Sequence, residues 1–142
     1  MAAFAVLLLA VAACSPAALQ VDRAMVEERA ADTIAQLDEL TLELISELAA
    51  EADAEVVLRQ ARGLGDTASA ERDFLDAEVP EGALGEPAQA SIERYRAALE
   101  RLETLAAEVV DGYPDIREDL FLELNDAIGT VIDLQGELED LG

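Results

Sequence analysis

Two stretches of the chain repeat apolar residues in steps of three and four, and one short turn separates them. The first stretch spans residues 87–110 and the second spans residues 115–139. Two such stripes joined by a short turn predict an antiparallel pair of helices. The spacing of Asp115 and Glu118 is that of an N-terminal capping box for the second helix. The stripe residues are Ile92, Tyr95, Leu99, Leu102, Ala106 and Val109, then Leu120, Leu124, Ala127, Val131, Leu134, Leu138 and Leu141.

A longer helix is expected before this pair. Residues 19–62 contain neither proline nor glycine, whereas Gly63 and Gly65 follow at once and are typical of a helix end. The segment predicts one helix of about 65 Å, much longer than the later two. Its apolar stripe consists of Val26, Ala30, Ile34, Leu37, Leu44, Leu48 and Val56.

Residues 63–86 are rich in glycine and acid and predict a connector that docks loosely on the helices. The expected fold is all-α: an antiparallel bundle of three main helices, the first one long, over residues 19–142. One alternative is that another chain, such as a second copy, supplies a fourth helix.

The charge of the chain and its missing residue types argue against several partners and several kinds of chemistry. The chain has 32 acidic residues against nine arginines, no lysine and no histidine, and its net charge is −23. Nucleic acid needs a basic footprint, so it is excluded as a partner, while basic proteins are favoured. The missing residue types argue against a di-iron or zinc centre, a Ser-His-Asp triad, a Schiff base and a P-loop. We therefore expect no enzyme activity and no cofactor.

Calcium is the metal that the abundant carboxylates would suit. Acidic residues crowd the expected connector, but they do not form the Asp-x-Asp-x-Asp-Gly pattern of a calcium loop. The connector thus offers an alternative function, the binding of a cation or small solute, without predicting a defined site. Its candidate ligands are Asp66, Asp73, Asp76, Glu78 and Glu81.

An apolar run opens the chain and stops at its single cysteine. Residues 2–13 are too short to cross a bilayer, which takes about 20 apolar residues, but they match the apolar region of a signal peptide. Val11-Ala12-Ala13-Cys14 resembles the lipobox of bacterial lipoproteins, which implies removal of residues 1–13 and a diacylglycerol on the Cys14 thiol. Residues 14–18 would then form a lipidated spacer. Two alternatives stay open: plain secretion after cleavage at Ala10-Val11-Ala12, and an uncleaved anchor.

Much of the remaining chain resembles the LemA family of membrane-anchored helical proteins. The stretch AALERLETLAAEVVDGYPDIREDLFLELNDAIGTVIDLQGEL (97–138) has the family's order of a leucine-rich helix, Tyr113-Pro114-Asp115, Phe121-Leu122 and Gly129-Thr130. ERAADTIAQL (28–37) and EVVLRQARGLGDTAS (55–69) fall where the family has its long first helix and following turn. The family's Pro-Asn-Leu segment and its final helix are absent. The resemblance implies an antiparallel bundle exposed outside the cytoplasmic membrane, and it implies no catalytic residues.

These observations favour a lipid-anchored helical bundle of the cell envelope that faces outside the cytoplasm. We expect it to act as an interaction or scaffolding module. Its expected partners are the membrane, through the covalent lipid on Cys14, and either a basic protein or a second copy of the chain.

Overall fold

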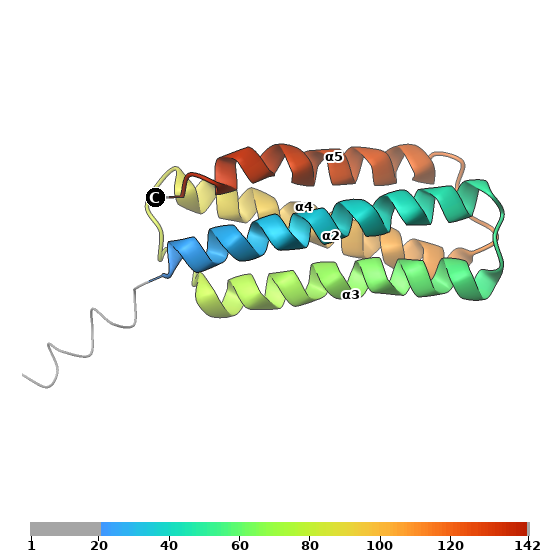
Figure 1. The fold of residues 1–142 in the computed structure, drawn as a ribbon, viewed down its shortest axis with the longest axis horizontal. Coiled ribbons are helices and arrows are strands. Elements are labelled where there is room, and N and C mark those ends of the chain that lie inside the picture. The colour runs from blue at the N-terminus through green and yellow to red at the C-terminus, as the bar shows by residue number, and fades with distance from the viewer. Residues whose placement is uncertain (1–20, 142) are drawn as a thin grey trace, which may run out of the picture.

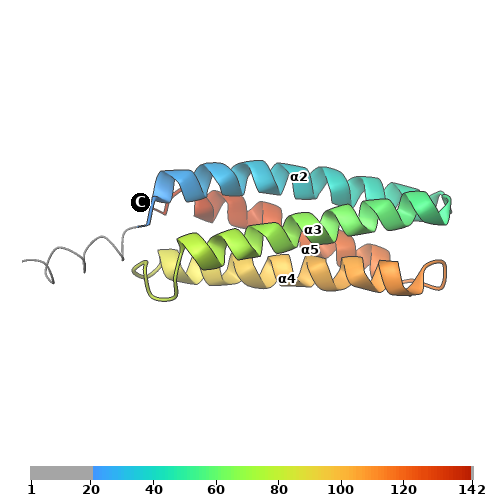
Figure 2. The same ribbon diagram turned by 90° about the horizontal axis from the view of Figure 1, so that it is seen from below.

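The computed structural model describes residues 21–141, which form an elongated bundle of four helices (Figure 1). The helices are α2 (Arg23–Ala49), α3 (Ala54–Glu78), α4 (Ala88–Gly112) and α5 (Leu120–Leu138). Successive helices run antiparallel, and each contacts its two neighbours, so that α5 closes the ring against α2 (Figure 2). The predicted all-α fold is confirmed.

The core runs along the whole bundle and consists mainly of leucine, with valine, isoleucine and alanine. Every residue of the two stripes predicted between Ile92 and Leu141 is buried. Tyr95 is the largest of the fully buried side chains. Because burial of a leucine or valine side chain stabilises a fold by about 1.5–3 kcal/mol, these stripes determine which faces of α4 and α5 turn inward.

The predicted helix 19–62 is wrong in its length, because the chain reverses direction at residues 50–53. The Glu51 N–H donates to the carbonyl oxygen of Leu48 at 3.2 Å, and the Ala52 N–H donates to that of Glu47 at 3.0 Å. This pattern is a Schellman helix end, whose left-handed residue is usually glycine. Here Glu51 takes that place with φ 50°, and the usual sequence signal for a helix end is therefore missing.

The predicted connector 63–86 is also wrong over most of its length. Helix α3 continues through Gly63 and Gly65 to residue 78. Each glycine costs a helix about 1 kcal/mol, but complete burial of Leu64 and Leu75 at helical spacing offsets that cost. The bundle therefore has four helices in its described part rather than three, and the fourth comes from the same chain. Only residues 79–87 form a loop between α3 and α4.

The predicted start of the last helix also needs correction. Helix α5 begins at Leu120 rather than at 115, because Ile116 folds back onto the core and residues 113–119 form tight turns. The predicted capping box is therefore not formed as a helix start, and Asp119 is the N-cap residue. Gly129 lies inside α5 beside open space: a Cβ added there would meet no atom of another helix within 4 Å.

The two ends of the bundle are made from different parts of the chain. We call the base the end where α2 begins and α5 ends, and the tip the end formed by the turns 50–53 and 113–119 (Figure 1). At the base, the Arg23 guanidinium donates to the carbonyl oxygen of Leu141, and the Leu141 N–H donates to the Glu27 carboxylate at 3.2 Å. These bonds hold the last described residues against α2.

None of the helices in residues 21–141 combines the length and the apolar character that a membrane span requires. The predicted signal peptide, Cys14 and the spacer 14–18 lie outside the described residues.

Candidate functional site

The candidate calcium ligands lie mostly along one helix instead of in a loop. Asp66, Asp73 and Asp76 are on α3, Glu78 is its last residue, and Glu81 follows in the loop. Asp66 and Asp76 are separated by about 15 Å along the helix axis. Among the side chains of residues 21–141, no group of three or more is placed to hold a metal ion. Most of the expected acidic connector is thus part of α3, so its candidate ligands are spread along a helix instead of gathered in a loop.

A carboxylate buried inside the bundle is the most unusual polar feature of the fold. The Glu71 side chain on α3 has no exposed surface (0%). Its Oε2 accepts hydrogen bonds from Arg29 Nε at 3.0 Å and from Thr33 Oγ1 at 2.8 Å, both on α2. Its Oε1 accepts a longer bond from the Tyr95 hydroxyl of α4 at 3.4 Å. One side chain thus links three helices.

The surroundings of Glu71 favour its protonated form. Burial raises the pKa of Glu71 above its ordinary value of 4.5, and the hydrogen bonds from Thr33 and Arg29 oppose this shift only in part. Burial, followed by the charge of Glu71, also raises the pKa of the Tyr95 hydroxyl. The cluster can therefore take up a proton more readily than a surface carboxylate can.

Arg29 connects Glu71 to an open groove between α2 and α3. Its guanidinium carbon lies 4.2 Å from the centre of the Phe74 ring, within the range of a cation–π contact. The side chain is 44% exposed, so its outer part borders the groove, which has a volume of about 670 Å³. Because three carboxylates line the groove with this one guanidinium, its field is negative and repels anions. The three are Glu28, Asp32 and Asp66.

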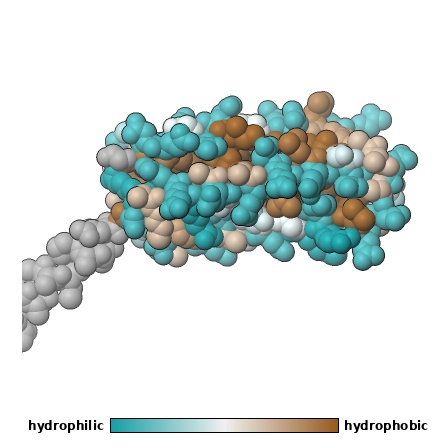
Figure 3. Space-filling model, viewed as in Figure 1, coloured by the Kyte–Doolittle hydropathy of each residue, from teal (hydrophilic) through white to brown (hydrophobic). Residues whose placement is uncertain are grey.

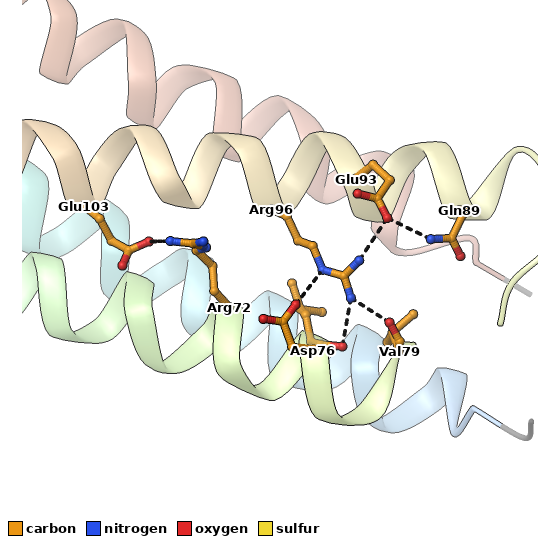
Figure 4. Close-up of polar contacts among 8 residues, drawn as sticks. Arg72, Asp76, Val79, Gln89, Glu93, Arg96 and Glu103 are labelled. Atoms are coloured by element: carbon orange, nitrogen blue, oxygen red, sulfur yellow. Dashed lines mark hydrogen bonds and ion pairs between the residues drawn. The ribbon is translucent and has the colours of Figure 1, made fainter. Parts of the chain in front are cut away.

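A second polar cluster joins α3 to α4 near the base, and Arg96 is at its centre (Figure 4). Arg96 Nη2 donates to the carbonyl oxygens of Leu75 and Val79 at 3.0 and 2.6 Å. Leu75 lies in the last turn of α3, where its carbonyl also accepts from the Val79 N–H at 2.8 Å, and Val79 is the C-cap residue, beyond which helical partners run out. The carboxylates of Asp76 and Glu93 flank the guanidinium at 3.3 and 2.9 Å. Arg96, a residue of α4, therefore caps the C-terminal end of α3.

Sequence reasoning missed the role of Glu71, although a signal for it exists. Leu64, Ala68, Glu71 and Leu75 step 4, 3, 4, so the carboxylate lies on the apolar stripe of α3. That stripe becomes visible only when residues 54–78 are treated as one helix, which Gly63 and Gly65 discourage.

The chain matches none of the protein-family models, curated proteins or solved structures with which it was compared. Its own residues therefore carry the functional argument.

Proposed function

We propose that the protein is a lipid-anchored helical bundle that acts outside the cytoplasm as an interaction or scaffolding module, and that it is not an enzyme. The lipobox-like Val11-Ala12-Ala13-Cys14 supports the anchor. The resemblance of residues 97–138 to the LemA family supports an anchored bundle. One observation carries the proposal: α2, the first described helix after Cys14 in the sequence, begins at the base, while the tip lies at the opposite end of the bundle (Figure 1). The 27 residues of α2 separate these ends by about 40 Å.

The charge of the bundle indicates the kind of partner it would attract. Six of the nine arginines form ion pairs with the protein's own carboxylates. The remaining carboxylates leave the surface strongly negative and favour a basic protein, whose association would weaken with salt.

The buried carboxylate supports a structural role rather than catalysis. Glu71 has no exposed surface and already binds three side chains, so a substrate has no route to its oxygens. A general acid or base must come within hydrogen-bond reach of the proton it transfers.

The anchor is tested by labelling the full chain metabolically with a palmitate analogue and measuring its intact mass after membrane extraction. We expect the parent chain and a Ser15→Ala control to be labelled and to lack residues 1–13. We expect Cys14→Ser to remain unlabelled. An unlabelled parent chain that is released into the medium, or a labelled Cys14→Ser variant, would show that the anchor is wrong.

A further inference from the structure

An apolar pocket opens at the tip, where the two turns meet. Its volume is about 470 Å³, and its lining comes from α2, from both turns and from α5. The Tyr113 hydroxyl donates to the carbonyl oxygen of Ala52 at 2.6 Å, which ties the two turns together. The lining residues are Leu48, Glu51, Tyr113, Pro114, Ile116 and Phe121.

Exposed apolar side chains also occur at the start of α5, next in sequence to Phe121 of the pocket lining. Ile116 and Phe121 are only partly buried, and the adjacent Leu122 is 74% exposed, more than any other large apolar side chain in residues 21–141. Figure 3 shows apolar side chains on the α2–α5 face gathered between the middle of the bundle and the tip, with hydrophilic ones around them. A side chain so exposed contributes little to the core, so its apolar surface is available to a partner.

The two segments around the pocket, residues 47–55 and 111–123, which we call its rim, are strongly acidic. Residues 47–55 contain four carboxylates and no arginine, and residues 111–123 contain five carboxylates and Arg117. The Arg117 guanidinium already pairs with Glu108, and with Asp119 and Glu123 at 3.0 Å each. The tip therefore combines an apolar pocket with an uncompensated negative charge.

We propose that the tip pocket docks an apolar side chain carried by a basic segment of a partner protein, an inference that rests on the proposed interaction function. The apolar side chain would enter the pocket, Leu122 in the first turn of α5 would contact the same segment, and arginine or lysine residues on either side would meet the acidic rim. Charge complementarity selects this occupant. A second copy of the chain would bring the same acidic rim against its own, and an anionic membrane surface would be repelled in the same way.

The test uses the full chain, purified in detergent, and three labelled peptides of equal length. The first carries arginines and serines around one leucine, the second replaces that leucine with serine, and the third replaces the arginines with glutamates. We expect the first peptide to bind most tightly, with an affinity that falls as salt is added. We expect Leu122→Ser to weaken this binding about tenfold, because the variant loses the apolar contact that Leu122 would make with the bound segment.

Ile132→Ser is the matched control, because Ile132 is also an exposed apolar residue of α5 (41% exposed) but lies farther from the tip. We expect this variant to bind the first peptide as the parent chain does. Equal losses in Leu122→Ser and Ile132→Ser would overturn the proposal, and so would equal binding of the acidic and basic peptides. Sedimentation that shows a dimer dissolved by Leu122→Ser would also overturn it, since the occupant would then be a second copy.

The anchor and the tip pocket can fail separately. A chain that takes up no palmitate but binds the basic peptide through Leu122 contradicts the anchor and upholds the pocket. A palmitoylated chain that binds no peptide at the tip contradicts the pocket and upholds the anchor.

Discussion

Replacing Glu51 with glycine should stabilise the protein, although the change removes a side chain. Glu51 ends α2 in the left-handed region, with φ 50°. That conformation costs an L-residue about 1–2 kcal/mol. Glycine adopts it freely but loses about 0.5–1 kcal/mol more in backbone entropy on folding. The backbone change alone should therefore raise the free energy of unfolding by about 0.5–1 kcal/mol.

Two further variants separate this backbone effect from the effect of the carboxylate. Glu51→Ala removes a negative charge from the negative end of the α2 dipole, which is worth about 0.3–1 kcal/mol, but it keeps the strained conformation. Glu51→Gly should gain both contributions and be the more stable of the two. Ala49→Gly, at the exposed last residue of α2, should instead lower the free energy of unfolding, by less than the roughly 1 kcal/mol that glycine costs inside a helix.

Urea unfolding followed by circular dichroism measures these differences, provided that all variants have the same dependence on urea. For a domain of this size, a gain of 1 kcal/mol raises the melting temperature by about 4 °C. If Glu51→Gly is no more stable than Glu51→Ala, then the left-handed residue is not a source of strain, and the proposed reason for its cost fails.

Three other substitutions test individual positions of the helices. Glu71→Gln should stabilise the fold relative to glutamate, because the folded state favours the protonated carboxyl of Glu71. The difference in free energy of unfolding should grow as pH rises from about 4.5 through the raised pKa of Glu71. Urea unfolding at a series of pH values, with Glu28→Gln as the exposed control, measures this difference. Arg96→Met should lower the free energy of unfolding by about 2 kcal/mol, since the carbonyls of Leu75 and Val79 at the end of α3 lose a charged donor. The control Arg101→Met, which removes an exposed ion pair, should cost less than about 1 kcal/mol. Gly129→Ala should gain about 1 kcal/mol, because open space surrounds that position, and a lower melting temperature would contradict this reading.

The sequence predicts the α4–α5 pair well and the α2–α3 pair poorly, for physical reasons that particular residues make clear. Every stripe residue of α4 and α5 is buried, because burial of leucine determines helix orientation and the stripe is regular. For α2 and α3, the sequence predicts the helix ends wrongly at two places. Gly63 and Gly65 suggest a helix end where burial of Leu64 keeps the helix intact, whereas the true reversal occurs at a glutamate.

The hydrogen-bonded cluster around Glu71 is also hard to predict from the sequence. Its partners come from three helices, and their convergence depends on the register in which α2, α3 and α4 pack. No local pattern encodes that register. What the sequence does show is one acid on an apolar stripe, which predicts a buried carboxylate without naming the groups that bind it.

The reversal at Glu51 also creates the surface on which the proposed interaction depends. A helix that continued through residues 50–53 would leave no turn to meet the turn 113–119, and the tip pocket would not form. The same residue lines that pocket and contributes to its acidic rim. Stability and binding should therefore respond to its replacement in opposite directions: Glu51→Gly should be more stable than the parent chain and should bind the basic leucine peptide less tightly. A variant that gains stability and keeps full affinity would show that the carboxylate of Glu51 does not take part in docking.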